Sequence, residues 1–235
     1  GKYMAALEIP ADKTNYGMFT RLRDLSQERT RLIIEKAAAS GGAPGSEAQK
    51  VGDFFASFMD EAAIEAKGLA PLKPELDAIA AIQTKADYAA LVGRNFRIRV
   101  PGPIFMGVGP DRKNPDRFVV QAGQSGLGLP DRDYYLDEKN PAFAAARTKY
   151  KAYIATLLGL AGFDNAAARA DAVFALETAI AKTHWTRVER RQAEKTYNPV
   201  PVAELPTRFP GIEWSQLIAG SGIPVQGEII IANPS

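Results

Sequence analysis

The single histidine, His184, limits the chemistry that this chain can perform. A zinc hydrolase motif such as H-E-x-x-H needs two imidazoles in fixed spacing, and one histidine cannot form it. The sequence contains no cysteine, which excludes disulfides, thiolate nucleophiles and cysteine-based metal sites. We expect His184 to be a partly buried residue on a helix, hydrogen-bonded to a neighbour, and we identify no catalytic or metal-binding residue.

Two other patterns could suggest chemistry. Residues 123–128, Gly-Gln-Ser-Gly-Leu-Gly, resemble a phosphate-binding loop, but the strand-then-helix setting and the following Lys-Ser or Lys-Thr are missing. We therefore predict a structural turn. Carboxylates are plentiful, yet spacing along one sequence does not place two of them at the separation that a glycosidase requires.

Composition excludes two classes of partner. The chain has a formal net charge of only +2, with acidic and basic residues mixed along it, so nucleic acid is not an expected partner. Charges interrupt every apolar stretch well before the roughly 20 residues of a membrane span. With 46% hydrophobic residues, the chain is expected to fold around one or two cores.

The spacing of apolar residues predicts a mainly α fold. From Tyr16 to about Ala39, apolar side chains recur every three, four or seven residues, which predicts a helix with one buried face. This face comprises Phe19, Leu22, Leu25, Leu32 and Ile33. Ser46 is a plausible N-cap for a second helix, which should end before Gly68. Further helices are expected over residues 75–82, 86–92, 141–162, 165–191, 202–205 and 214–219. Thr84 should begin the helix at 86–92 and Gly93 end it, Asn140 should cap the next helix, and Asp164 or Asn165 the one after it.

A change of period marks a β region around residues 95–122. Phe96, Ile98 and Val100 alternate with arginines, and two more apolar runs flank a Pro-Asp-Arg-Lys-Asn-Pro turn. We expect a β-hairpin or a small sheet there. Residues 229–231 begin another strand, and no linker divides the chain cleanly.

One segment resembles a known family signature. Residues 126–135, Gly-Leu-Gly-Leu-Pro-Asp-Arg-Asp-Tyr-Tyr, are similar to the Leu-Gly-Leu-Pro-x-Arg-Asp-Tyr-Tyr signature of the neprilysin and endothelin-converting enzyme family, peptidase family M13. Other segments resemble bacterial members in the same order, from about Ile9 to Ile231. They include residues 9–12, 16–19, 110–114, 176–181, 184–185, 189–191 and 195–198.

The signature residues suit a structural role. Arg132 could offer a bidentate fork to a carboxylate, and Asp133 could accept hydrogen bonds from backbone donors. Tyr134 and Tyr135 would add apolar area with polar tips. We predict that these four residues support the scaffold and do not contact substrate.

The resemblance implies a two-lobed zinc metalloendopeptidase that hydrolyses oligopeptides. Residues 1–235 would form its amino-terminal region, a helical cap that limits substrate size and borders the cleft. In the family, zinc is bound by H-E-x-x-H and a later E-x-x-x-D, both of which would lie downstream in a thermolysin-like lobe. This chain alone is then expected to be inactive, with peptide substrates and that zinc lobe as partners. Bacterial relatives imply a periplasmic or lipoprotein-anchored location.

Two substrate-binding candidates follow from the same resemblance. Close relatives of neprilysin carry R-Y-G-x-F-D-x-x-R, whose arginines hold the carboxyl-terminal side of the substrate. The matching stretch here runs from Asn15 to Arg23. Arg23 matches the second arginine, whereas Asn15 replaces the first and Thr20 replaces the aspartate.

Two alternatives remain open. The chain could be a stand-alone helical peptide-binding or scaffold module that lost the catalytic lobe. The apolar run at residues 229–231 argues against it, because an unpaired strand edge is a poor end for a stable fold. An unrelated helical hydrolase that uses carboxylates ranks last.

Overall fold

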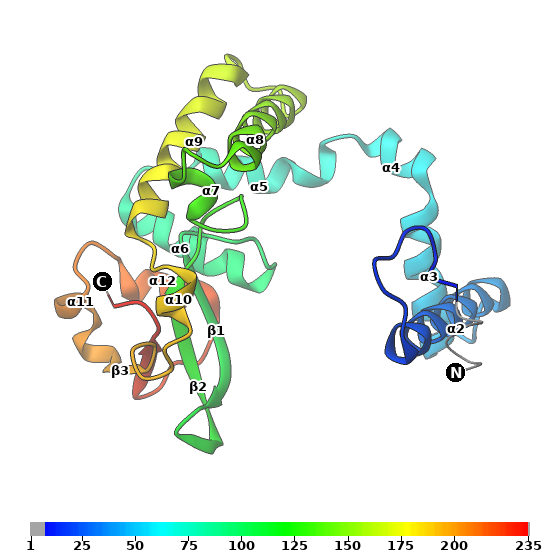
Figure 1. Ribbon diagram of the computed structural model, residues 1–235, viewed down its shortest axis with the longest axis horizontal. Helices are drawn as coiled ribbons and strands as arrows, with labels where there is room; N and C mark the ends of the chain where they lie inside the picture. The colour runs from blue at the N-terminus through cyan, green and yellow to red at the C-terminus, as the bar shows by residue number, and fades with distance from the viewer. Residues whose placement is uncertain (1–7, 235) are drawn as a thin grey trace. The chain divides into compact units, whose positions relative to one another are not determined.

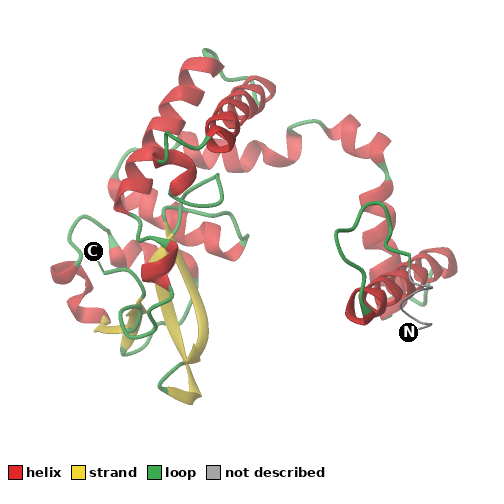
Figure 2. Cartoon of the chain, in the orientation of Figure 1, coloured by secondary structure: helices red, strands yellow, loops and turns green. Residues whose placement is uncertain are grey.

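The computed structural model describes residues 8–234, and the fold is mainly helical with one small sheet, as predicted (Figure 2). The chain divides into two compact units, one ending at Pro71 and the other beginning at Leu72. The expectation that no linker divides the chain was therefore wrong. In the part that the structure describes, no helix is both long and apolar enough to cross a membrane.

Within residues 8–71, the first unit contains the helices α2 (Met18–Ser40), α3 (Glu47–Met59) and α4 (Glu61–Lys67) (Figure 1). The predicted first helix and the Ser46 N-cap are confirmed, since the Ser46 hydroxyl accepts a hydrogen bond from the amide of Gln49 at 3.2 Å. The prediction of one uninterrupted second helix was wrong. Asp60 ends α3 and its carboxylate caps α4 through the amide of Ala63 at 3.0 Å.

The predicted buried face of α2 is exposed within its unit. Phe19 is 90% exposed, Leu22 53% and Ile33 67%. On α3, Phe54 and Phe58 are also exposed. Among residues 8–71 only Ala37 and Gly52 are buried, where α2 and α3 touch. The prediction that this face is buried was therefore wrong for the unit as described, because residues 8–71 provide no second layer to cover it.

A short 3-10 turn (Ala70–Leu72) spans the boundary between the two units. The second unit continues with α5 (Lys73–Ala80) and α6 (Lys85–Arg97). Thr84 and Asp87 form a capping box at the start of α6. The predicted end at Gly93 was wrong, and so was the predicted strand at residues 96–100. The helix continues because Gly93 packs against α12 (Trp214–Ser221), where a Cβ would overlap the carbonyl oxygen of Leu217.

The sheet is larger than the predicted hairpin. Strands β1 (Ile104–Asp111) and β2 (Asn114–Gln124) form that hairpin, which confirms the turn. Strand β4 (Glu228–Ile231) lies parallel to β2 and antiparallel to β3 (Asn198–Pro201), giving the order β1-β2-β4-β3. Residues 229–231, which were expected to leave an unpaired strand edge, thus form an inner strand that is paired on both sides. The unpaired edge therefore no longer argues against a stand-alone module.

The core of the second unit lies between one face of the sheet and helices α6 and α12. Its central side chains come from all of these elements and from the start of α11 (Leu205–Arg208), which follows a short 3-10 turn (Val202–Glu204). They are Ala89, Val92, Met106, Val120, Ala122, Val200, Leu205, Trp214, Leu217, Ile229 and Ile231.

Four helices follow β2 and precede β3 along the chain: α7 (Asp133–Leu136), α8 (Pro141–Leu160), α9 (Ala166–Thr183) and α10 (Arg187–Arg190). The predicted Asn140 cap of α8 is confirmed. Asn165 precedes α9 but makes no side-chain cap. The prediction of one helix to residue 191 was wrong, because His184 is extended and Thr186 caps the separate helix α10.

Candidate functional site

The two predicted substrate-binding residues lie at the start of the first unit. Arg23 is on the first turns of α2, and its exposed guanidinium is 3.7 Å from the carboxylate of Asp24. Asn15 is also exposed, just before the helix. Lys13 forms the tighter ion pair with Asp24. Both candidates are accessible within their unit, and their contact with substrate stays a prediction.

The signature segment builds a partly buried polar cluster around Glu177. The hydroxyl of Tyr135 donates to Glu177 at 2.6 Å and accepts from the amide of Leu129 at 2.9 Å. Tyr150 donates to the other carboxylate oxygen at 2.9 Å. Burial raises the pKa of Tyr135, and it raises the pKa of Tyr150 to about 12, so both phenols stay protonated at neutral pH. Two tyrosine donors thereby satisfy one carboxylate.

Two of the proposed signature interactions fall on other residues. The buried acceptor is Asp131, which takes a hydrogen bond from the amide of Asp133 at 2.8 Å, whereas Asp133 itself is exposed. Asp131 pairs with Arg187. The predicted fork of Arg132 is not formed, since its buried Nε has no hydrogen-bond partner among the described residues. The ring of Tyr134 packs 4.2 Å from that of Phe143.

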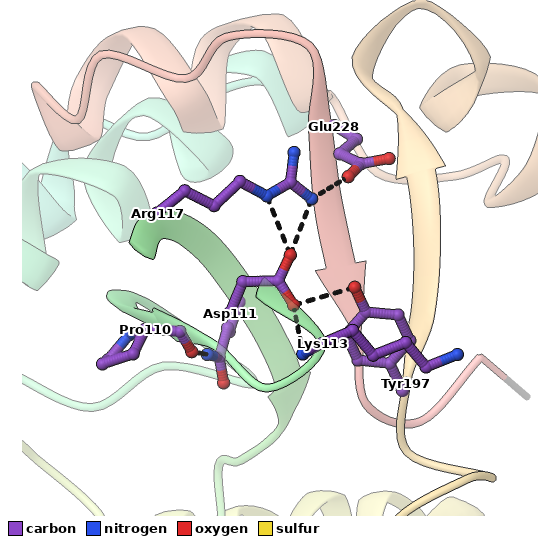
Figure 3. A network of polar contacts seen from close by, with 7 residues as sticks. Pro110, Asp111, Lys113, Arg117, Tyr197 and Glu228 are labelled. Carbon is purple, nitrogen blue, oxygen red and sulfur yellow. Dashed lines mark hydrogen bonds and ion pairs between the residues drawn. The ribbon is translucent and has the colours of Figure 1, made fainter. Parts of the chain in front are cut away.

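A second polar cluster surrounds Asp111 at the hairpin turn (Figure 3). Its carboxylate is 1% exposed and accepts from the amide of Lys113 at 2.9 Å, the hydroxyl of Tyr197 at 2.8 Å and Nε of Arg117 at 2.8 Å. Arg117 also pairs with Glu228 (Figure 3). The hydrogen bond from Lys113, followed by those from Tyr197 and Arg117, lowers the pKa of Asp111 to about 2.

These clusters join segments that lie far apart in sequence. The Asp111 cluster brings residues 110–114 against residues 195–198, and Arg112 adds a 2.8 Å hydrogen bond to the carbonyl of Thr196. The Glu177 cluster brings the signature segment against α9. All these segments carry the family resemblance, but their pairing could not be predicted from spacing. Because each carboxylate is occupied by donors, both clusters serve to hold the fold.

His184 is partly buried and hydrogen-bonded as expected, but it lies just after α9 in an extended conformation, so its predicted position on a helix was wrong. Its Nε2 lies 3.1 Å from the carbonyl oxygen of Ser125, and burial lowers its pKa, so the ring is neutral at neutral pH. The next residue, Trp185, exchanges backbone hydrogen bonds with the side chain of Gln124. Both contacts are made by residues of the Gly-rich segment 123–128. Gly126 in this segment adopts a positive φ of 91°, which favours glycine.

The described residues do not fit a zinc site. Within residues 8–234 no three His, Cys, Asp or Glu side chains gather closely enough to hold a metal ion. An apolar cavity of about 330 Å³ lies beside His184, lined by Ile180, Trp214 and Ile231 among others. Among its polar lining residues are Thr183, whose hydroxyl donates to the carbonyl of Ile180 at 2.8 Å, and His184.

Comparison with known proteins decides the family. The model of peptidase family M13, in its amino-terminal part, matches residues 1–235. The chain belongs to peptidase family M13. The resemblance drawn from residues 126–135 is thereby confirmed, and the M13 assignment extends over both structural units.

Several M13 relatives match nearly the whole chain. Endothelin-converting enzyme 1 of Rattus norvegicus is 28% identical over 237 residues, and that of Homo sapiens is 29% identical over 238. Each match covers 96% of this chain and 30% of the relative. The chain therefore spans less than a third of the length of these enzymes.

Solved structures give the same result. Zinc metalloprotease Zmp1 of Mycobacterium tuberculosis in complex with an inhibitor is 36% identical, with a TM-score of 0.87 over 99% of this chain and 36% of Zmp1. Its open state gives a TM-score of 0.89 at 37% identity. PepO of Lactobacillus rhamnosis, 16% identical with a TM-score of 0.72, shares the fold.

Proposed function

We propose that this chain is the amino-terminal, substrate-restricting part of a zinc metalloendopeptidase that hydrolyses oligopeptides. The observation that carries the proposal is the M13 match to residues 1–235 in a chain that spans 30% of its endothelin-converting enzyme relatives. Within residues 8–234 no three His, Cys, Asp or Glu side chains lie close enough together to hold a metal ion, so zinc would be held by other parts of the protein.

The exposed apolar faces support this role. Monomeric proteins rarely leave large contiguous apolar patches in water, yet α2 and α3 expose Phe19, Ile33, Phe54 and Phe58. Such faces suit a lobe that packs against further protein and lines an enclosed cavity. The alternative, a stand-alone peptide-binding or scaffold module, would leave the same side chains in water.

The first test uses the 235-residue chain itself. Purified protein should release no product from a fluorogenic oligopeptide, and should retain less than about 0.1 zinc per chain after dialysis against micromolar zinc, since ligands for tight binding are missing. Turnover that o-phenanthroline abolishes, or one zinc per chain, would show that the chain holds the active site and would overturn the proposal.

The second test concerns the gene. We propose that the coding region continues after Ser235 into H-E-x-x-H and E-x-x-x-D. Sequencing that region distinguishes the proposal from its alternative, because a natural stop codon after Ser235 would leave only a binding module. In the longer protein, we expect cleavage of short peptides and none of folded proteins, which is the measurable result of size restriction.

The substrate-binding role of Arg23 and Asn15 is part of the proposal. In the longer protein, Arg23→Gln should raise KM for an oligopeptide about tenfold with little change in kcat, because one charge-assisted hydrogen bond is lost. Arg21→Gln, an exposed arginine two residues earlier on α2, is the control and should change neither constant. Asn15→Ala should act in the same direction as Arg23→Gln and more weakly, because an uncharged hydrogen bond is weaker.

We also propose an extracytoplasmic location, periplasmic or lipoprotein-anchored, from the family resemblance alone. Fractionation of the source cells with an antibody against this chain tests it. Recovery of the protein in the cytoplasmic fraction would reject the location without affecting the enzymatic proposal.

A further inference from the structure

A small cavity lies beside the segment that carries the family signature, and we call it the signature cavity. Its volume is about 130 Å³. Its lining residues lie between 124 and 132, from the end of β2 onward, and between 184 and 190, up to the end of α10. Both segments belong to the second unit. Since a water occupies about 30 Å³ in the liquid, the cavity has room for a few waters or for one small anion.

One side chain of the cavity wall carries a buried nitrogen that lacks a partner. Nε of Arg132 is buried and makes no hydrogen bond to the described residues. Residues of this chain already bury the nitrogen, so further protein around the chain could add to that burial and could not expose it. An unpaired charged donor in a protein interior is strongly unfavourable. Nε of Arg132 therefore requires a partner small enough to lie inside the fold.

The charges that line the cavity are predominantly positive. Three arginines face one carboxylate there, because the titratable lining residues are Asp131, Arg132, His184, Arg187 and Arg190. Asp131 is already paired with Arg187. In the part of the chain that the structure describes, Arg132 and Arg190 form no ion pair. Two guanidinium charges at the cavity are thus left without a counterion.

Glu189 does not supply that counterion. It lies close enough to Arg132 for the two charges to interact, but it does not line the cavity. Its Oε2 accepts hydrogen bonds from the amide and the hydroxyl of Thr186, at 2.8 and 2.7 Å. The capping box of α10 thereby fixes the carboxylate, and Nε of Arg132 stays unpaired.

His184 experiences the same positive charges. Burial lowers the pKa of its ring, and the charges of Arg190 and Arg132 lower that pKa further, against the hydrogen bond with the carbonyl of Ser125. Both arginines therefore act on a ring that itself lines the cavity. A negative charge bound between them would have the opposite effect and would favour the imidazolium.

We propose that the signature cavity binds one small inorganic oxyanion of the size of sulfate or phosphate. Nε of Arg132 donates a hydrogen bond to one of its oxygens, and Arg190 completes the neutralisation of its charge. Guanidinium groups suit this task, because their planar fork of donors matches the geometry of an oxyanion. The anion joins the signature segment to the segment around α10. This binding requires neither zinc nor hydrolysis, so its test is independent of the proposed enzymatic function.

The test uses the single histidine of the chain as its reporter. Sodium sulfate is titrated into the 235-residue chain without an affinity tag, and the Hε1 proton of His184 is followed by NMR. Sodium gluconate, a bulkier anion, keeps the ionic strength at about 0.1 M, so that charge screening stays constant. The signal should saturate at one sulfate per chain with a Kd of about 1 mM. The pKa of His184 should be higher in sulfate than in gluconate alone.

Matched variants locate the site. Arg190→Gln should weaken sulfate binding about tenfold, because one charge-assisted interaction is lost. Arg191→Gln should leave the Kd unchanged, since Arg191 is exposed and does not line the cavity. Arg132→Lys keeps the charge and removes the Nε donor, and it should also weaken binding about tenfold. Circular dichroism confirms that each variant is folded, and the Arg190 and Arg191 pair decides if Arg132→Lys does not fold.

Four results would overturn the proposal. A signal that does not saturate by about 20 mM sulfate would mean that water alone fills the cavity. Equal shifts in sulfate and gluconate, or equal effects of the Arg190 and Arg191 variants, would assign the response to charges at the surface. Absence of sulfate binding in the longer protein would mean that one of its own side chains occupies the cavity.

Discussion

The helix pairs α2/α3 and α6/α12 both meet through glycine, but within the described part of the chain only α6/α12 is covered by a sheet. Gly52 brings α3 close to Ala37 of α2, and Gly93 brings α6 close to Leu217 of α12. Among residues 8–71 little beyond this contact is buried, whereas α6 and α12 continue into a core with four strands. An amphipathic pattern therefore shows which face needs cover, and it does not show that the cover belongs to the same unit.

Separating the two units gives the largest expected effect. Residues 72–235 should keep a cooperative thermal transition, because their core is internal. Residues 1–71 should show no cooperative thermal transition, because only two of the described residues there are buried and the apolar faces stay in water. Circular dichroism during heating measures both. A sharp transition from residues 1–71 alone would contradict the comparison.

A matched pair of leucine substitutions, one in each helix pair, tests the difference in burial between α6/α12 and α2/α3. Leu217→Ala removes a side chain that is 2% exposed, and should lower the free energy of unfolding by about 2–5 kcal/mol. Leu22→Ala, at a helical site that is 53% exposed, should change it by about 0.5 kcal/mol or less. Urea unfolding followed at 222 nm gives both values. Similar losses would mean that α2 is covered in solution.

Glycine substitutions test the close helix contact. Gly93→Ala should destabilise the second unit by about 1–3 kcal/mol, because the new methyl overlaps the backbone of Leu217. Gly159→Ala in α8 is the control, since a Cβ there meets nothing within 4 Å. It should stabilise by about 0.5–1 kcal/mol through helix propensity. Shifts in urea midpoint measure both, and destabilisation by both variants would argue against a specific contact at Gly93.

Acid titration gives the smallest expected effect. The pKa of Asp111 falls from its ordinary value of 3.8 to about 2 on folding, so its contribution to stability is complete above pH 3.8 and is lost as pH falls to about 2. Asp111→Asn should therefore be less stable than the original chain at pH 5 and equally stable near pH 2. The exposed Asp116→Asn serves as the control. A stability difference that does not depend on pH would contradict this assignment.

Local residue patterns predicted the elements well where a cap or a turn defines them. Ser46, Thr84 and Asn140 mark helix starts that the structure confirms, and the turn at residues 110–115 gave the hairpin. Predictions failed where a tertiary contact decided the boundary. The local pattern predicts a helix end at Gly93, yet this glycine permits the crossing of α6 and α12.

The polar clusters were beyond prediction for a similar reason. The sequence pointed to Asp133 and Arg132 as the interacting signature residues, whereas the fold buries Asp131 and pairs it with Arg187. One position along a tight turn decides which carboxylate faces inward, and sequence spacing does not resolve it. The roles of Asn15 and Arg23 stay predictions, because they depend on a bound substrate.

The sequence by itself determined the family, the helical class, the hairpin and the lack of a histidine-based metal site, because each depends on residue type or local spacing. Tertiary structure alone decided that residues 229–231 form an inner strand, that Asp111 meets Tyr197 and that Tyr135 meets Glu177. These contacts join segments separated by tens of residues. The geometry of the folded backbone sets them, and no local pattern encodes it.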